Sequence, residues 1–395
     1  ENVVARLAQV PGVDAILFGH SHGEFPGTFF GKHPAVDLAR GTIHGVPAVM
    51  AGAWGSHLGV VDLVLDDSSG AWRVKEGRSH LRPVFDRATR KALVQPDPVI
   101  NALVAEEHAA TVKQMNAEVA RTTAPITSYF ALVRDDASVQ VVAEAQREHA
   151  KKLLKGTPHE GLPLLSAAAP FKAGGRMGAN YYTDVPAGPL ALRGVASLYV
   201  YPNTLKAVKL TGAQVREWLE MSAGQFNRIA PDGPAEQPLV NEAFRTYNFD
   251  VIEGLQYELD LTQPARYDGN GKLQAPQARR VVNVRHNGQA LDDTAQFIVV
   301  TNNYRASGGG SFPGLDGSQI VLDTQDETRV VLAEYLSAQK TYTPQTDGNW
   351  RVRPVPGVKL WFDTGAGALP YQAATPQARL MKALDNGFAR FELLP

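Results

Sequence analysis

The sequence predicts an α/β protein in which a helix joins a short N-terminal unit to a larger second domain. The chain has 395 residues, a length that corresponds to two or three domains. Apolar runs of strand length alternate with amphipathic helical segments along most of it. Asp97-Pro98 begins an expected helix over residues 97–120, because Asp is a good N-cap and Pro suits the first helical position. We therefore divide the chain into residues 1–95, a linking helix at 96–121 and a domain at 122–395.

The N-terminal unit is expected to begin with a helix over Glu1–Val10, which ends at Pro11-Gly12. The apolar run Val13–Phe18 is of strand length and leads into a loop, Gly19-His20-Ser21-His22-Gly23. Further strands are expected at Pro47–Ala51, Gly59–Leu65 and Ala71–Lys75.

The second domain alternates between the two kinds of element. Helices are predicted at Ala137–Lys152, Thr211–Met221, with Thr211 as its cap, and Glu327–Ala338. Strands are predicted at Leu162–Ala168, Ser197–Tyr201, Leu205–Leu210, Val251–Leu261, Arg280–Val284 and Phe297–Thr301. Glycine-rich loops are predicted after two of the strands, at Ala173–Arg176 and Ser307–Ser311. Neither loop has the spacing of a P-loop or of a dinucleotide-binding fingerprint.

Composition excludes several classes of function. The 39 basic and 40 acidic residues nearly balance, which argues against a binder of nucleic acid polymers. The chain has no cysteine, so disulfides and thiolate metal sites are excluded. We find no apolar run long enough to span a membrane and no signal peptide. Because the sequence opens on Glu1-Asn2-Val3, we expect it to continue a longer chain.

The histidine loop is the first candidate site. His20 and His22 are two residues apart after a buried strand, and in an extended backbone such side chains point the same way. Because neutral imidazole is a common metal ligand, the two side chains could bind one ion. The alternative is that they are ordinary surface histidines in a polar loop. A catalytic zinc takes at least three protein ligands. His57 is a weaker candidate, which we expect to act as a cap or to support a ligand.

Two tyrosines form the second candidate site. Tyr201 and Tyr304 each end a predicted strand and lead into turn-forming residues. Two such rings on adjacent loops could hold a nucleobase between them, and Asn203 could hydrogen-bond the base edge. The alternative is that both are core tyrosines that complete buried strands.

Several ordered motifs resemble the 5′-nucleotidase family of calcineurin-like metallophosphatases. Within that family, the branch of periplasmic 2′,3′-cyclic-nucleotide 2′-phosphodiesterase/3′-nucleotidases is the most similar. The motifs are Pro11–His22, Ala53–Gly59, Ala169–Arg176, Tyr199–Thr204, Tyr247–Asp250 and Thr301–Gly310.

The resemblance implies a fold and a chemistry. It implies the C-terminal part of a four-layer metallophosphatase domain, a linking helix and an α/β substrate-binding domain. Two divalent ions (Zn, Mn or Co) would act on a small nucleotide, in a monomer that is periplasmic or secreted and contacts no membrane. His20 and His22 would be metal ligands, whereas the other ligands and the catalytic histidine would precede Glu1. The chain alone is therefore expected to be inactive.

The same resemblance assigns substrate contacts. It makes Tyr201 and Tyr304 the base-stacking pair and Asn203 a base contact. Arg176 would contact substrate oxygens through its planar guanidinium, unless it is an ordinary surface arginine. Gly254 would lie where the backbone approaches the ligand.

Gly310 decides between branches of the family. The plain 5′-nucleotidase pattern has an acidic residue at this position, and that residue binds ribose hydroxyls. A chain without the acidic residue suits substrates that carry phosphate on the 2′ and 3′ oxygens. The predicted activity is hydrolysis of 2′,3′-cyclic nucleotides to 3′-nucleotides, then to nucleoside and phosphate. The alternatives are a 5′-nucleotidase or UDP-sugar hydrolase, a nucleotide-binding module without catalysis, and a structural or adhesive domain.

Overall fold

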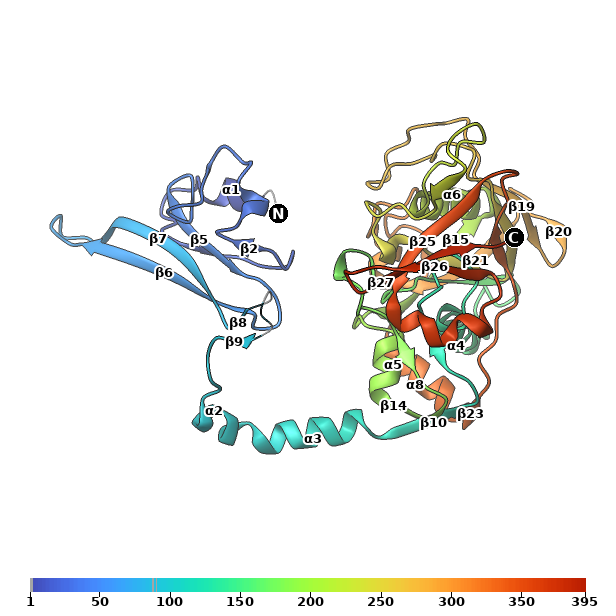
Figure 1. Ribbon diagram of the computed structural model, residues 1–395, viewed down its shortest axis with the longest axis horizontal. Coiled ribbons are helices and arrows are strands. Elements are labelled where there is room, and N and C mark those ends of the chain that lie inside the picture. The colour runs from blue at the N-terminus through green and yellow to red at the C-terminus, as the bar shows by residue number, and fades with distance from the viewer. Residues whose placement is uncertain (1–2, 87–88, 90) are drawn as a thin grey trace. The chain divides into compact units, whose positions relative to one another are not determined.

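The computed structural model describes residues 3–86, 89 and 91–395 and shows a mixed α/β protein (Figure 1). The chain separates into two compact units, Glu1–His108 and Ala109–Pro395. None of the helices in the described ranges has the length and apolarity of a membrane span. The start of the helix expected from Glu1 lies outside the described residues.

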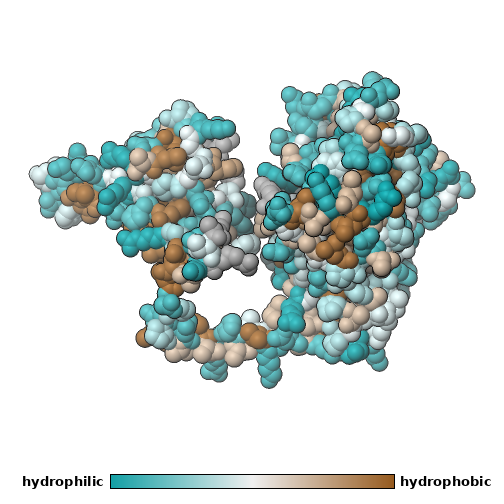
Figure 2. All heavy atoms as spheres, viewed as in Figure 1, coloured by the Kyte–Doolittle hydropathy of each residue, from teal (hydrophilic) through white to brown (hydrophobic). Residues whose placement is uncertain are grey.

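The first unit is a small sheet with a long hairpin. Val13–Phe18 contributes only a two-residue strand, which pairs in parallel with the strand over Val46–Ala51. Its apolar core includes the buried side chains of Phe25 and Met50. Large apolar side chains remain exposed on the hairpin, as the brown areas of Figure 2 illustrate. The elements are α1 (Val3–Leu7), β1 (Ile16–Leu17), β2 (Glu24–Phe25), β3 (Val36–Asp37), β4 (Thr42–Ile43), β5 (Val46–Ala51), β6 (His57–Asp66), β7 (Arg73–Pro83), β8 (Phe85–Asp86) and β9 (Lys91–Ala92).

The single helix predicted over residues 97–120 is wrong in its length. Asp97 does cap a helix, since its carboxylate accepts the N–H groups of Val99 and Ile100. That helix, α2 (Pro98–Leu103), ends at Val104, and α3 (Ala105–Met115) follows it. The next residues form a strand, β10 (Glu118–Thr122), between β14 (Gly188–Ala191) and β23 (Thr341–Tyr342). Pairing with strands far away in the sequence decides this segment, and the local helical pattern did not reveal it.

A five-stranded mixed sheet forms the centre of the second unit. Its order is β17-β12-β21-β15-β22. The helices α4 and α8 pack on one side of it and α6 on the other (Figure 1). The bounds are β12 (Leu164–Ala168), β15 (Thr204–Thr211), β17 (Val251–Glu253), β21 (Gln296–Asn302), β22 (Ile320–Glu327), α4 (Ala137–Leu154), α6 (Gly212–Ser222) and α8 (Thr328–Gln339).

Smaller sheets surround this centre. One has the order β20-β19-β18-β24 and another the order β16-β25-β27-β26. The remaining elements are β11 (Ile126–Thr127), β13 (Asp184–Val185), α5 (Leu192–Leu198), β16 (Glu236–Pro238), β18 (Leu255–Leu259), β19 (Val281–His286), β20 (Gln289–Ala290), α7 (Asn303–Ala306), β24 (Trp350–Val352), β25 (Lys359–Gly365), β26 (Ala378–Ala383) and β27 (Phe388–Leu393).

Two further predictions of secondary structure differ from the structure. Ser197–Tyr201 is not a strand, because α5 extends to Leu198 and buries Val195 and Leu198 on one helical face. The run predicted as one strand over Val251–Leu261 is divided into β17 and β18 by Gly254, whose φ is 93°. The helix predicted from Thr211 is confirmed, and the Thr211 side chain forms a capping box with Gln214.

Candidate functional site: one edge of the central sheet

Four segments that are distant in the sequence meet at one edge of the central sheet. The strands β12 and β21 are parallel and end there, whereas β15 and β17 run antiparallel to them and begin there. Leu205 is opposite Asn302, and the backbone N–H of Thr204 donates to Asn303 Oδ1 at 3.1 Å. Four of the motifs noted in the sequence therefore gather at this edge: those at residues 169–176, 199–204, 247–250 and 301–310.

Both candidate stacking residues lie at this edge and are accessible. Tyr201 precedes β15 and Tyr304 lies in α7, directly after β21. Their exposed fractions are 38% and 43%, whereas that of the neighbouring Tyr199 is 1%. The alternative that Tyr201 and Tyr304 are core residues is therefore wrong, and Tyr199 is the tyrosine that fills the core. Partial burial, with the nearby Tyr247, raises the pKa of Tyr304, so its phenol is neutral at physiological pH.

Aromatic neighbours orient these two rings. Phe171 makes edge-to-face contacts with Tyr199 and Tyr201, at centroid distances of 5.0 and 5.1 Å. Tyr247 makes a similar contact with Tyr304 at 6.4 Å. Such contacts favour a defined ring orientation. Phe171 and Tyr247 both lie within motifs noted in the sequence, but the sequence did not show that they contact the tyrosines.

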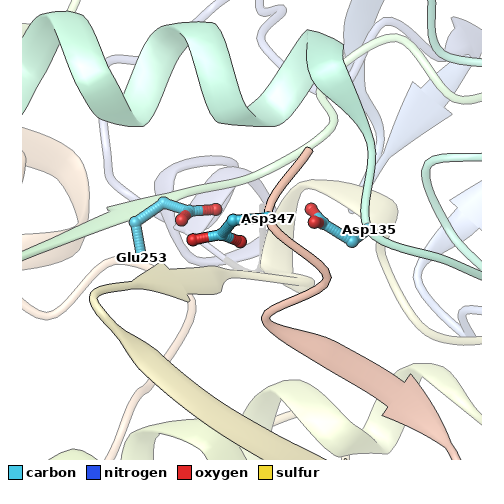
Figure 3. A group of neighbouring side chains, drawn as sticks. All are labelled: Asp135, Glu253 and Asp347. Atoms are coloured by element: carbon cyan, nitrogen blue, oxygen red, sulfur yellow. The ribbon is translucent and has the colours of Figure 1, made fainter. Parts of the chain in front are cut away.

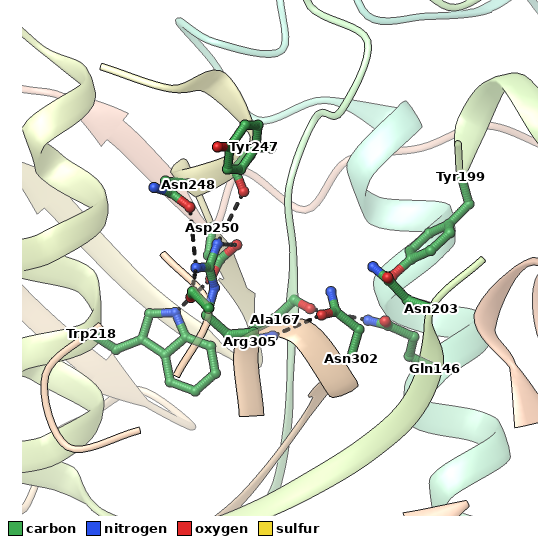
Figure 4. Close-up of polar contacts among 11 residues, drawn as sticks. Gln146, Ala167, Tyr199, Asn203, Trp218, Tyr247, Asn248, Asp250, Asn302 and Arg305 are labelled. Atoms are coloured by element: carbon green, nitrogen blue, oxygen red, sulfur yellow. Dashed lines mark hydrogen bonds and ion pairs between the residues drawn. The ribbon is translucent and has the colours of Figure 1, made fainter. Parts of the chain in front are cut away.

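Asn203 is positioned by its backbone more than by its side chain. Its carbonyl oxygen accepts the N–H of Thr328 at 2.9 Å, whereas its Nδ2 donates to Tyr199 Oη over a longer distance of 3.4 Å (Figure 4). An amide held by one long hydrogen bond can exchange that partner for a ligand.

A buried arginine supports the loop that carries Tyr304. Arg305 is 2% exposed, and its guanidinium uses all of its N–H donors (Figure 4). Nε donates to Asp250 Oδ2 at 2.7 Å, Nη1 to Asn248 Oδ1 at 3.2 Å and to Gly309 O at 2.5 Å, and Nη2 to Tyr247 O at 3.0 Å and to Asp250 Oδ1 at 3.3 Å. A fully satisfied guanidinium is a structural group, and this one joins the segment at 247–250 to the loop at 304–310.

Two further groups complete the surroundings of Arg305. Asp250 is 5% exposed and also accepts the indole N–H of Trp218 at 2.8 Å. The guanidinium lies over the Phe312 ring at 3.7 Å from its centroid. The sequence alone did not indicate a role for any of these residues.

Gly310 has a conformational reason to be glycine. Its φ is 78°, and a Cβ at this position would overlap Arg305 Nη1 and Asn248 Oδ1. Most side chains adopt such a φ only with strain. Packing against Arg305 therefore gives a second explanation for the absence of an acidic side chain here, beside the substrate preference inferred from the sequence.

One of the predicted substrate contacts lies away from this edge, and the side chain of another is not described. Gly254 lies at the other end of β17, where a Cβ would come within 2.8 Å of the Leu165 side chain. Packing between strands explains that glycine, so the structure does not support the prediction that it approaches the ligand. The backbone of Arg176 lies in a short 3-10 helix over Gly175–Met177, but its side chain is outside the described part of the chain.

The histidine loop differs from the geometry assumed for it. His20 and His22 are exposed and have φ values of 74° and 58°, so the backbone is not extended and strand-like alternation does not apply. The ring of His22 lies 5.9 Å from that of Trp54. In the described residues, no group of three or more acidic or histidine side chains close enough for one ion includes either histidine. His57 Nδ1 lies 2.9 Å from Ser56 Oγ.

Comparison with known proteins gives these features a family context. Residues 118–317 match the family described as 5′-nucleotidase, C-terminal domain. The whole chain is 43% identical to part of a trifunctional nucleotide phosphoesterase of Bacillus subtilis and spans 27% of that protein. It is 44% identical to a 2′,3′-cyclic-nucleotide 2′-phosphodiesterase/3′-nucleotidase of Salmonella typhimurium and spans 63% of it.

A solved structure supports the same fold. It comes from Staphylococcus aureus, is named as a candidate 5′-nucleotidase, and superimposes with a TM-score of 0.58 at 20% identity over 86% of this chain and 56% of its own. The matched family segment contains the strands and loops that form the edge with Tyr201 and Tyr304. The chain belongs to the 5′-nucleotidase C-terminal domain family.

Proposed function

We propose that the intact protein hydrolyses 2′,3′-cyclic nucleotides to 3′-nucleotides, and 3′-nucleotides to nucleoside and phosphate. The observation that carries this proposal is the convergence of four motifs at one sheet edge with two accessible tyrosines. The activity is the one named for relatives that are 42–46% identical to this chain. Each of those relatives is longer than the segment that it shares with this chain.

In this proposal the second unit binds the nucleoside. Tyr201 and Tyr304 stack on the two faces of the base, and Asn203 hydrogen-bonds its edge. Arg305 holds the loop of Tyr304 in place, and Arg176 reaches ribose or phosphate oxygens. The base is an uncharged, flat group, which suits two neutral aromatic rings.

The chain supplies two of the ligands expected in the proposed metal centre. His20 and His22 could each donate a ring nitrogen to one of two divalent ions, of Zn, Mn or Co, which would activate water and polarise the phosphate. Two imidazoles are fewer ligands than one catalytic zinc requires. We accordingly propose that residues 1–95 are the C-terminal part of a metallophosphatase domain, 96–121 its connection, and 122–395 the nucleotide-binding domain of a periplasmic or secreted monomer.

The activity is tested with the intact protein. Loaded with manganese, cobalt or zinc, it should release 3′-nucleotides from 2′,3′-cyclic AMP and phosphate from 3′-AMP. Turnover of 5′-AMP or UDP-glucose in preference to both would favour the 5′-nucleotidase or UDP-sugar hydrolase alternative. An intact protein that leaves cyclic nucleotides and 3′-AMP unchanged under all three metals would contradict the proposal.

A second candidate function is nucleoside binding without turnover by this chain alone. Two observations favour it: Tyr201 and Tyr304 are exposed, and the histidine loop offers two imidazoles, fewer than one catalytic zinc requires. Calorimetry with adenosine and 3′-AMP should show binding by the 395-residue chain. Tyr201→Ala and Tyr304→Ala should each weaken it by about 1–3 kcal/mol, the usual contribution of one stacked base.

A control tyrosine separates stacking from general destabilisation. Tyr371→Ala removes a ring that stacks on Tyr129 and donates to Asp184 at 2.6 Å, outside the four converging motifs, and should leave affinity unchanged. Equal losses in all three variants, or unchanged affinity in Tyr201→Ala, would show that the two tyrosines do not hold the base.

A further inference from the structure

Three carboxylates from segments that are distant in the sequence meet in the second unit. Asp135 precedes α4, Glu253 ends β17, and Asp347 lies in the loop before β24. One oxygen from each lies within 4.8 Å of the other two, and the three side chains point toward one another (Figure 3). Three anionic groups this close repel one another unless protons or a cation compensate.

Glu253 is the member of this cluster that has a buried oxygen without a hydrogen-bond partner in the described residues. It is 2% exposed, and this oxygen is Oε1. Asp135 differs, because it accepts the N–H of Gly348 at 2.7 Å. Burial first, and then Asp347 and Asp135, raise the pKa of Glu253 to about 9. Buried polar groups in proteins almost always have a partner, so this oxygen points to one that belongs to a ligand.

The surroundings add oxygen atoms and leave a surplus of negative charge. Asn349 is 1% exposed; its Nδ2 donates to Ile252 O at 3.3 Å, and its Oδ1 is buried without a partner in the described residues. Arg147 of α4 opposes the charge of the cluster, whereas Glu144 of the same helix adds to it. The charge of Arg147 does not by itself balance this group of carboxylates.

We propose that Asp135, Glu253 and Asp347 bind a divalent cation, and that this cation is Ca²⁺. Carboxylate and amide oxygens are hard ligands, and Ca²⁺ takes 6–8 of them at about 2.3–2.6 Å in flexible geometry. Two oxygens on one such ion lie at most about 5 Å apart, twice that bond length, which the spacing within 4.8 Å already allows. Mg²⁺ requires a near-ideal octahedron and retains water, so it suits this cluster less well.

The ion would join three segments that no disulfide connects. It would hold the start of α4 and the loop at residue 347 against β17. That strand has three residues, Val251–Glu253, and directly follows Asp250, the partner of Arg305. The cation would therefore stabilise the strand next to the proposed nucleoside site, although its binding does not depend on the proposed activity.

Thermal unfolding of the full chain tests this site. After removal of metals with EDTA and dialysis, CaCl₂ at about 100 times its dissociation constant should raise the Tm by about 5 °C relative to NaCl of equal ionic strength. MgCl₂ at the same concentration should raise it less. The rise should be absent in Glu253→Gln, and metal-free Glu253→Gln should be at least as stable as the metal-free parent, because glutamine resembles the protonated carboxyl that a pKa of about 9 gives Glu253 without a cation.

Two controls and a second variant locate the effect. Glu258→Gln removes an acidic side chain in β18 that pairs with Arg351 and should retain the calcium-dependent rise, as should the double variant His20→Ala, His22→Ala. Should Glu253→Gln not fold, Asp347→Asn, at an exposed position, should show the same loss of the rise.

Several outcomes of the thermal unfolding experiment would contradict the proposed calcium site. An unchanged Tm of the parent chain in calcium would mean that the carboxylates share protons instead. A rise that persists in the folded cluster variant would place the ion elsewhere, and a rise that disappears in the histidine double variant would assign it to the histidine loop. An equal rise with magnesium would contradict the assignment to Ca²⁺.

Discussion

Replacement of Arg305 by methionine is expected to lower the free energy of unfolding by about 3–5 kcal/mol, the usual effect of breaking a buried ion pair. The variant leaves the Asp250 carboxylate, which is 5% exposed, with the indole N–H of Trp218 as a hydrogen-bond donor but without its cationic partner. It also removes the hydrogen bonds to Asn248 Oδ1, Gly309 O and Tyr247 O. Urea denaturation, with the slope checked for a two-state transition, measures the loss.

A solvent-accessible ion pair provides the control for the loss of stability in Arg305→Met. Arg216 donates to Asp293 at 3.0 Å, and the two side chains are 23% and 60% exposed. Arg216→Met should therefore cost no more than about 1 kcal/mol. Asp250→Asn combined with Arg305→Met should cost less than the sum of the two single variants, because the buried charge is removed with its partner. A loss below about 1 kcal/mol in Arg305→Met would show that the arginine does not hold the loop.

Replacement of Gly310 by alanine is expected to lower the free energy of unfolding by about 2–6 kcal/mol, the sum of a strain term and an overpacking term of about 1–3 kcal/mol each. The strain arises because a non-glycine residue at a φ of 78° is disfavoured. The overpacking arises because the new methyl group would overlap Arg305 Nη1 and Asn248 Oδ1. Nucleoside affinity should fall with stability, since the displaced guanidinium supports the loop of Tyr304.

A nearby glycine gives a matched control for backbone strain. Gly314 has a φ of 73°, but a Cβ at this position would have no heavy atom of the described residues within 4 Å beyond its chain neighbours. Gly314→Ala should therefore show the strain without the overlap. The difference between the two variants in urea denaturation isolates the contact with Arg305. Equal costs would mean that the overlap is relieved without loss.

Gly310→Asp tests the two explanations for this glycine. Packing predicts a destabilised protein that gains no affinity for nucleosides. A stable variant with tighter adenosine binding in calorimetry would instead support the sequence-based interpretation, in which an acidic side chain here reaches ribose hydroxyls.

The elements that could be predicted from the sequence alone are those formed by neighbours along the chain. The periodicity over 137–152 predicted α4, and Thr211 predicted the start of α6, because helices and their caps are made from residues three or four apart. The apolar runs predicted β12, β15 and β21. The motifs that contain Tyr201 and Tyr304 could be recognised as family features without knowledge of their contacts.

Contacts between distant segments became visible in the folded protein alone. Residues 118–122 became a strand because their partners are β14 and β23, and Ser197 and Leu198 became helical. A Cβ at Gly310 would overlap Arg305, and the partner of Arg305 is Asp250, 55 residues earlier in the chain. Asp135, Glu253 and Asp347 are separated by more than ninety residues at each step. Side-chain hydrogen bonding and charge compensation act through space, so the order of residues did not reveal these contacts.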